Sequence, residues 1–261
     1  MTMNAKRVAL ITGASTGLGA EFARLFARDG YDLVLVARSL GRLETLAQEL
    51  AVFQVKAHVI AEDLAKPGAA GRVWERVQGL GVQIECLVNN AGFGSTGALL
   101  DLPASSQVEM IELNCVTLLE LTHAFGRPMR ERGHGRILNI ASTAGFQPGP
   151  YMATYYATKA FVLSLTEALA HELKRHGVSV TCHCPGATAT EFASRAGNDK
   201  SKLFQRPGVA KADAVAAHAY KALMQGKVLS IHGILNWLAV QALRVSPRAI
   251  VRRIAAALNQ A

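Results

Sequence analysis

The chain has 261 residues, of which 50% are hydrophobic and 18% are charged, which is ample for one large α/β core and short for two domains. Its net charge of +9 comes from basic residues spread along the chain without interleaved aromatic residues, so nucleic-acid binding is not expected, whereas a basic surface suits an anionic cofactor. The first predicted strand begins too early for a signal peptide, and apolar stretches end well before the ~18–20 residues of a membrane span, so a cytoplasmic location is expected.

A glycine-rich turn with the spacing G-x-x-x-G-x-G joins the first predicted strand, 7–12, to a predicted helix, 17–29. Such a turn lets the backbone approach a pyrophosphate, and the helix N-terminus adds free N–H groups and partial positive charge. Glycines also mark ordinary turns, but the strand–turn–helix context favours a dinucleotide site. The predicted cofactor contacts of this turn are Gly13, Ser15, Thr16, Gly17, Leu18 and Gly19.

The same turn also matches G-x-S-x-G, the nucleophile elbow of α/β-hydrolases, with Ser15 in the nucleophile position. A hydrolase needs earlier strands and an oxyanion loop before its elbow, and only twelve residues precede Gly13. Gly19 would also have no role in that chemistry. The hydrolase interpretation is therefore rejected.

The end of the second predicted strand, 31–37, indicates the cofactor. An acidic residue there would bind the ribose hydroxyls of NAD. This chain has Arg38, whose guanidinium can make charge-assisted hydrogen bonds to a 2′-phosphate, followed by Ser39 as a further donor. The alternative is that Arg38 is a solvated surface arginine. We predict NADP (NADPH) as the cofactor.

Strands and helices alternate along the rest of the chain. The predicted strands are 7–12, 31–37, 55–60, 84–88, 135–141, 178–184 and 227–231. The predicted helices are 17–29, 40–50, 66–79, 104–126, 152–176 and 209–225, with further helix after Ile234. This pattern predicts one α/β domain over 1–261, a doubly wound parallel sheet (Rossmann-type) of about seven strands with helices on both faces. Ligands of such sheets bind at the carboxyl ends of the strands, where Asp63, Asn90 and Ser142 fall.

Tyr155 and Lys159 stand four residues apart in the predicted helix 152–176, and so share one helix face. The Lys159 ammonium is expected to lower the pKa of the Tyr155 phenol from its usual value of about 10, giving a general acid/base near neutral pH. Ser142 can donate a second hydrogen bond to the same substrate oxygen. Taken alone, such a pair is more often a solvated helix face; the glycine turn favours catalysis.

Four cysteines invite a check for a metal site, and Cys182-His183-Cys184 is their only cluster. The cluster lies in a predicted strand, where both cysteines point to one face and His183 to the other. No second cluster supplies further ligands, so buried small hydrophobic residues are expected and no metal site is predicted.

Seven motifs in one order resemble the short-chain dehydrogenase/reductase family, over roughly the first three quarters of the chain. They are Thr12-Gly13-x-x-x-Gly17-x-Gly19, Asp63-Leu64, Asn89-Asn90-Ala91-Gly92, Asn114, Ser142, Tyr155-x-x-x-Lys159 and Pro185-Gly186-x-x-x-Thr190. The segment 152–159 resembles that of a bacterial subset of the family, and Arg38 makes an NADP-preferring member of this subset the expectation. Besides the turn, the resemblance implies cofactor contacts from Asp63, Leu64, Asn90, Ala91, Gly92, Tyr155, Lys159, Pro185, Gly186, Thr188 and Thr190.

The resemblance also implies a reaction, reversible hydride transfer between NADP(H) and a carbonyl or secondary alcohol, with reduction favoured. Tyr155 would be the acid/base, Lys159 would hold the nicotinamide ribose, and Ser142 would bind the substrate oxygen. Asn114 would hold a water that relays protons to the lysine, although a hydrogen-bonded helix asparagine is the plainer interpretation. The alternative function is a non-catalytic NADP-binding sensor or scaffold, which would be expected to lose the tyrosine or the lysine. The substrate itself is not predicted.

Two further segments carry expectations about the substrate and the partners. The segment 187–209 lacks periodicity and is predicted to be a substrate lid. An apolar substrate pocket is expected from Phe93, Phe146, Tyr151, Met152 and Phe192. The two long helices, 104–126 and 152–176, form the usual subunit interface of the resembled family, which implies a homodimer or homotetramer.

The C-terminal extension, 234–261, is the part that the motifs explain least. Ser246 and Pro247 are predicted as the N-cap and first residue of a helix in which Ile250, Ile254 and Leu258 form an apolar stripe opposite basic residues. Such a helix could lie on an anionic membrane surface. Docking on the protein itself or on a neighbouring subunit is favoured, because most amphipathic helices bury their stripe within the protein.

Overall fold

Short apolar strands with no alternation of polar residues form the centre of the fold. All the residues of β1 (Val8–Thr12) and β2 (Asp32–Ala37) are buried, as in parallel sheets that are covered on both faces. The remaining strands of this sheet are β3 (Ala57–Ala61), β4 (Ile84–Asn89), β5 (Gly135–Ile140), β6 (Val178–Cys184) and β9 (Leu229–Ile231). The computed structural model describes residues 6–192, 196–197 and 209–260.

The seven strands pair in the order β3-β2-β1-β4-β5-β6-β9, and every pair is parallel. All seven predicted strands are present, so the predicted fold class is confirmed. The chain order of the strands reverses between β1 and β4. The carboxyl ends of all the strands therefore meet at one edge, with a topological switch point in the middle of it, where ligands of this architecture bind.

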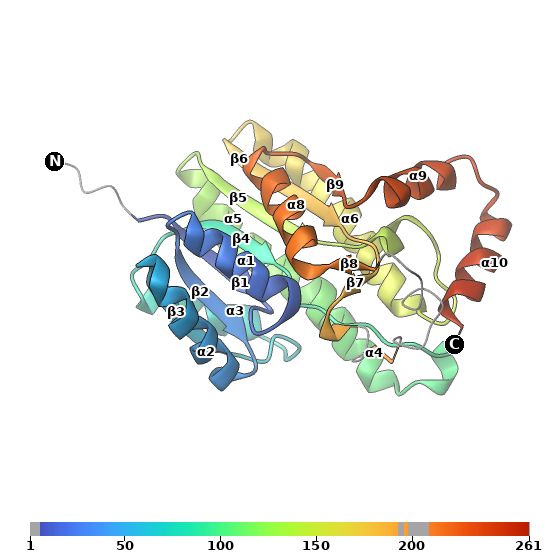
Figure 1. The fold of residues 1–261 in the computed structure, drawn as a ribbon, viewed down its shortest axis with the longest axis horizontal. Coiled ribbons are helices and arrows are strands. Elements are labelled where there is room, and N and C mark those ends of the chain that lie inside the picture. The colour runs from blue at the N-terminus through green and yellow to red at the C-terminus, as the bar shows by residue number, and fades with distance from the viewer. Residues whose placement is uncertain (1–5, 193–195, 198–208, 261) are drawn as a thin grey trace.

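Helices cover both faces of the sheet (Figure 1). One face is covered by α1 (Gly17–Arg28), α2 (Leu40–Leu50) and α8 (Ala212–Met224). The other is covered by α3 (Ala69–Gly79), α5 (Leu118–Glu131) and α6 (Ala153–Lys174). Each layer buries its own hydrophobic cluster against the sheet, and this rigid frame fixes the loops at the carboxyl edge.

The predicted helix 104–126 is not one regular α-helix. It consists of α4 (Ala104–Ile111), a π-helical segment (Glu112–Thr117) and α5, which continues past the predicted end to Glu131. The π segment contains Asn114, whose side chain is bonded to neighbouring elements rather than to its own helix. Such local widening of a helix is frequent at functional sites.

Cys182 and Cys184 are buried in the apolar surroundings of β6, as expected of small hydrophobic residues. His183, between them, is buried as well, and its Nδ1 lies 3.2 Å from the hydroxyl of Ser230 on the neighbouring strand β9. The cluster thus serves the packing at this end of the sheet.

The C-terminal extension folds into two helices, α9 (Ile234–Leu243) and α10 (Arg248–Asn259), at the end of the molecule opposite β3 and α2 (Figure 1). The predicted cap is wrong: α10 begins at Arg248, and the Ser246 hydroxyl donates back to the carbonyl of Ala242 in α9. No helix in the described part of the chain has the length and apolar character that crossing a bilayer requires.

Short elements complete the structure. They are the 3₁₀ turns Ala51–Phe53, Leu99–Asp101 and Thr143–Phe146 and the two-stranded sheet of β7 (Thr188–Ala189) and β8 (Ala210–Lys211). Most of the predicted lid, 187–209, lies outside the described residues, which omit 193–195 and 198–208. Its first described residues form β7 at the edge of the cavity considered next.

Candidate active site

A cavity of about 1010 Å³ follows the carboxyl edge of the sheet. Its walls come from the loops after β1, β2, β3, β4, β5 and β6, the elements on which the sequence motifs were found. The predicted residues that line it are Gly13, Ser15, Thr16, Gly17, Leu18, Arg38, Ser39, Asp63, Leu64, Asn90, Ala91, Gly92, Ser142, Tyr155, Lys159, Pro185, Gly186, Thr188 and Thr190. Gly19 and Asn114 do not line the cavity, and both lie directly behind its wall.

The glycine turn is packed too closely for side chains. Gly13 and Gly17 have positive φ angles, +65° and +55°, which favour glycine. A Cβ atom on Gly19 would lie 2.1 Å from the carbonyl oxygen of Gly13, so the N-terminus of α1 can approach the turn only without one. The three glycines therefore leave an open cradle of backbone at a helix N-terminus.

Thr12 ties this cradle to the loop after β4. Its hydroxyl accepts hydrogen bonds from the backbone N–H groups of Asn90 and Ala91, both at 3.0 Å, and the Asn90 amide donates to the carbonyl of Thr12 at 2.9 Å. Thr12 was not predicted as a site residue. The sequence feature that could have indicated Thr12 as a site residue is its polar side chain at the end of an apolar strand.

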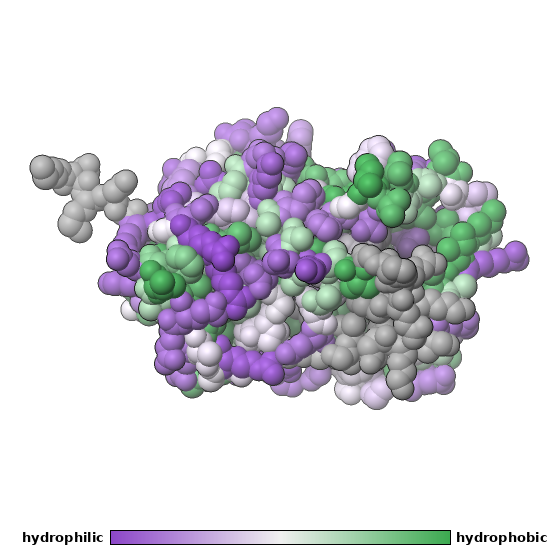
Figure 2. Space-filling model, in the orientation of Figure 1, coloured by the Kyte–Doolittle hydropathy of each residue, from purple (hydrophilic) through white to green (hydrophobic). Residues whose placement is uncertain are grey.

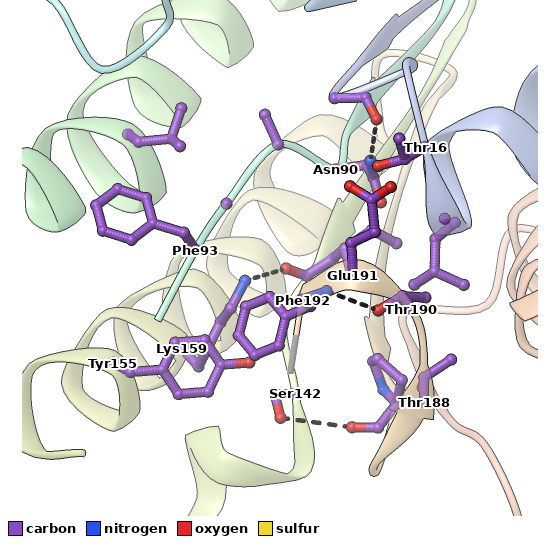
Figure 3. Close-up of a pocket in the computed structure, with 18 of the residues that line it drawn as sticks. Thr16, Asn90, Phe93, Ser142, Tyr155, Lys159, Thr188, Thr190, Glu191 and Phe192 are labelled. Carbon is purple, nitrogen blue, oxygen red and sulfur yellow. Dashed lines mark hydrogen bonds between the residues drawn. The ribbon is translucent and has the colours of Figure 1, made fainter. Parts of the chain in front are cut away.

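Tyr155, Lys159 and Ser142 face the same part of the cavity (Figure 3). The first two come from one face of α6, and Ser142 follows the end of β5. The Lys159 Nζ donates to the carbonyl of Ile140 at 2.8 Å and lies 5.7 Å from the centre of the Tyr155 ring. The Ser142 hydroxyl accepts from the Ala144 N–H at 3.1 Å and donates to the Pro185 carbonyl at 3.4 Å. These bonds hold each group at the cavity wall.

Burial sets the protonation of both titratable groups. It raises the pKa of Tyr155 above its usual value, and the Ser142 hydroxyl lowers that pKa by less. Burial also lowers the pKa of Lys159 to about 8. The expected lowering of the Tyr155 pKa by Lys159 is therefore not seen, because burial has the largest effect and raises that pKa. Tyr155 is protonated at neutral pH, the state in which a phenol can donate a proton.

Asn114 is buried behind the site and joins three elements. Its Oδ1 accepts from the Phe93 N–H at 3.1 Å, and its Nδ2 donates to the Phe93 carbonyl at 2.9 Å and to the Thr158 hydroxyl at 3.1 Å. A Cβ atom on Gly92 would lie 3.0 Å from the Asn114 Oδ1 and 3.6 Å from the Lys159 Nζ. The side chains of Asn114 and Lys159 thus both lie close to Gly92. The hydrogen bonds of Asn114 connect α6 to the loop after β4.

A second arginine lines the end of the cavity that holds Arg38 and Ser39. The Nη1 of Arg42 donates to both carboxylate oxygens of Glu191 at 3.1 Å, which joins α2 to the segment after β7. Neither Arg42 nor Glu191 was predicted. Arg42 stands four residues after Arg38 at the start of α2, and that spacing was the signal that could have found it.

Fewer residues than predicted line the apolar end of the cavity. Phe93, Met152 and Phe192 line it, and the ring of Phe192 lies 5.3 Å from that of Tyr155. Phe146 packs elsewhere in the core, and Tyr151 sits in the turn before α6 with a φ of +64°. Asn236 of α9 and Leu258 of α10 also line the cavity, and the sequence did not predict either.

These features fit a nicotinamide dinucleotide. The glycine cradle leaves the space that a Cβ would fill, beside backbone N–H groups that suit a pyrophosphate. Arg38 lies at one end of the cavity, beside the Arg42–Glu191 ion pair, and Lys159 lies beside Tyr155.

Comparisons with known proteins agree with this site. The sequence profile of the family described as short chain dehydrogenase matches residues 7–201. The chain is similar to a very-long-chain 3-oxoacyl-CoA reductase of Phaeosphaeria nodorum, 37% identical over 67% of this chain and 52% of that protein. It is also 34% identical to a 7β-hydroxysteroid dehydrogenase of Collinsella aerofaciens, over 69% of this chain and 68% of that protein. The chain spans about half the length of the first curated relatives it matches.

A solved structure extends the likeness to nearly the whole chain. It is a short-chain dehydrogenase from Sphingobium yanoikuyae in complex with NADPH, with 36% identity, a TM-score of 0.82, and coverage of 92% of this chain and 94% of that one. The family inferred from the sequence motifs is confirmed. The chain therefore belongs to the short-chain dehydrogenase/reductase family, whose members are oxidoreductases that use a nicotinamide cofactor.

Proposed function

We propose that the protein is an NADPH-dependent reductase of carbonyl compounds, with the reverse oxidation of a secondary alcohol available. One observation carries the proposal. Tyr155, Ser142 and Lys159 converge on one cavity whose opposite end is a glycine cradle flanked by Arg38 and Arg42. The relative from Sphingobium yanoikuyae, solved with NADPH, supports the choice of cofactor.

The residues of the chain account for the handling of the proton. A bound nicotinamide cofactor supplies the hydride. The Tyr155 phenol, which is protonated at neutral pH, donates its proton to the carbonyl oxygen, to which Ser142 donates a second hydrogen bond. Lys159, with a pKa of about 8, carries a positive charge at neutral pH that opposes the negative charge left on Tyr155. Asn114 keeps its predicted role of holding a water that relays protons to Lys159.

The substrate class follows from the walls of the cavity beside Tyr155. Phe93, Met152, Phe192 and Leu258 present apolar surface next to the phenol. A carbonyl flanked by bulky apolar groups suits such walls better than a small polar one. The two relatives are named for a very-long-chain 3-oxoacyl-CoA and for a steroid, and both compounds carry a large apolar part.

A panel of ketones and aldehydes tests the function directly. We expect apolar ketones to cause NADPH consumption, which is measured by the loss of NADPH absorbance. Small polar carbonyls should cause little consumption. The alternative, a non-catalytic NADP-binding sensor or scaffold, predicts that NADPH binds and that no member of the panel consumes it. The presence of both Tyr155 and Lys159 in one cavity favours the enzyme.

Arg38 is proposed to bind the 2′-phosphate, so Ala37→Asp combined with Arg38→Leu should move the preference from NADPH towards NADH. Loss of a charge-assisted hydrogen bond and gain of a repelling carboxylate should weaken NADPH binding by about 10–100-fold. Fluorescence titration of both cofactors measures the change. Arg127→Leu, an exposed position on α5 outside the cavity, is the control. Unchanged NADPH binding would assign the phosphate to Arg42 instead.

The rate of reduction should fall as the pH rises through about 8, the pKa of Lys159. Below that pH the ammonium is charged, and above it the charge beside Tyr155 is lost while the phenol stays protonated. A pH profile of kcat/KM in the reducing direction measures this. Lys159→Arg keeps its charge at alkaline pH and should remove the fall. A wild-type profile that stays level well above pH 8 would contradict the role of Lys159.

A homodimer or homotetramer remains part of the proposal. Large apolar side chains are exposed along α4, α5 and α6, the helices that the sequence indicated as an interface. They are Val108, Ile111, Leu119 and Phe161, with Leu99 and Leu100 just before α4.

A further inference from the structure

Helix α9 is apolar and yet almost uncovered. Its ten residues, Ile234–Leu243, include no charged side chain, and Val240 alone among them is buried. A helix that is hydrophobic all round is normally buried. Here Leu235 is 78% exposed, and Ile234, Trp237 and Leu238 are exposed beside it.

Helix α10 continues the same surface. The stripe Val251, Ala255 and Asn259 packs on the protein, while Ile250 and Ile254 remain exposed. The predicted apolar stripe is therefore divided: only Leu258 turns inward to the cavity. Figure 2 shows hydrophobic side chains gathered over this end of the molecule.

Asn259 fastens α10 to the body of the enzyme. Its Oδ1 accepts from the Tyr156 hydroxyl at 3.1 Å, and its Nδ2 donates to the Pro150 carbonyl at 2.9 Å. The apolar surface of α9 and α10 is thus held in place by a packed face and by these two hydrogen bonds. Val245, 87% exposed in the connection between the helices, extends it.

The charged side chains of the segment that forms this surface have one sign. Arg244, Arg248, Arg252 and Arg253 are exposed, and residues 232–261 contain no Asp or Glu. None of the four arginines forms an ion pair with the residues that the structure describes. Exposed apolar side chains, an indole and a cluster of arginines together are typical of helices that lie in the interface of an anionic bilayer.

A second copy of the chain is the other occupant to consider. A two-fold contact through α9 and α10 would bring the arginines of both copies together without an acidic residue from either segment to pair with them. Lipid phosphates would neutralise them, and acyl chains would cover the apolar side chains. We propose that α9 and α10 dock the protein on the surface of an anionic phospholipid membrane. Asn236 and Leu258 place this surface next to the cavity.

Co-sedimentation of the full chain with vesicles tests the proposal, independently of any activity. The vesicles are phosphatidylcholine alone, or phosphatidylcholine with an equal part of phosphatidylglycerol. We expect binding to the anionic vesicles only. Arg248→Gln with Arg252→Gln and Arg253→Gln should weaken it about 100-fold, because each basic residue near an anionic surface contributes about five-fold.

The apolar contribution is tested separately by Leu235→Glu with Leu238→Glu, which should weaken binding by more than about 10-fold. Val52→Glu is the matched control, since Val52 is 74% exposed but lies after α2, away from α9 and α10, and its binding should equal that of the wild type. The proposal is overturned if the wild type does not bind anionic vesicles, or if Val52→Glu weakens binding as much. It is also overturned if the leucine variant only dissociates an oligomer in size-exclusion chromatography, which would make a second copy the occupant.

Discussion

Tyr155→Phe should lower kcat for carbonyl reduction by ~10²–10⁴-fold, the usual effect of removing a general acid. The substitution removes the hydroxyl and keeps the ring, which packs beside Phe192 and among the apolar residues of the cavity wall. NADPH binding and the free energy of unfolding should therefore stay close to those of the wild type. Steady-state kinetics, fluorescence titration and urea unfolding measure the three quantities.

Tyr156→Phe is the matched control, since it removes a phenol from the neighbouring position on α6. The Tyr156 hydroxyl donates to the buried Asn259, so its loss leaves an acceptor unpaired and should lower the free energy of unfolding by ~1–3 kcal/mol. Turnover should change little. Tyr155→Phe should thus lower kcat and leave the free energy of unfolding unchanged, whereas Tyr156→Phe should do the reverse. Wild-type turnover in Tyr155→Phe would remove Tyr155 from the mechanism.

The sequence predicts the strands of this fold well, because their apolar runs are short and are separated by helical periodicity. Each of the seven strands of the main sheet lies within a few residues of its predicted bounds. The π segment at Glu112–Thr117 is different. Its Asn114 bonds to Phe93 and Thr158, which are distant in the chain, and the spacing of the apolar residues does not indicate the wider turn.

Most of the predicted residues line one cavity, because each motif is a short run next to a strand end and the strand ends meet at one edge of the sheet. Glu191, Asn236 and Leu258 were missed, because only the folded chain brings them to the cavity. The direction of the Tyr155 pKa was also predicted wrongly. The spacing of Tyr155 and Lys159 indicates a shared helix face, but it does not give the depth of burial, which raises the pKa of Tyr155.

At the C-terminus, the predicted cap failed because Ser246 has two ways to satisfy its hydroxyl. It bonds to the last turn of the preceding helix, through the Ala242 carbonyl, instead of to the first turn of α10. Serine side chains commonly make either bond. The sequence places the residue near a helix end without deciding which helix it belongs to.

Gly19→Ala should disrupt the cofactor cradle although Gly19 lies behind the cavity wall. The added methyl group would lie 2.1 Å from the Gly13 carbonyl oxygen and 2.8 Å from the Asn90 amide, so the N-terminus of α1 must move away from the turn. We expect the free energy of unfolding to fall by ~1–3 kcal/mol from overpacking. A shift of the cradle on the order of 1 Å should lower kcat/KM about 100-fold, with weaker NADPH binding.

Gly71→Ala separates this effect from the general consequences of replacing a glycine in a helix. Gly71 lies in α3, and nothing stands within 4 Å of a Cβ atom built on it. The extra methyl group restricts the unfolded chain and favours the helix, so this variant should gain ~0.5–1 kcal/mol of stability and keep wild-type kinetics. Urea unfolding and NADPH titration of both variants give the comparison. If Gly19→Ala binds NADPH as tightly as Gly71→Ala, the close approach of α1 to the turn is not what forms the cofactor site.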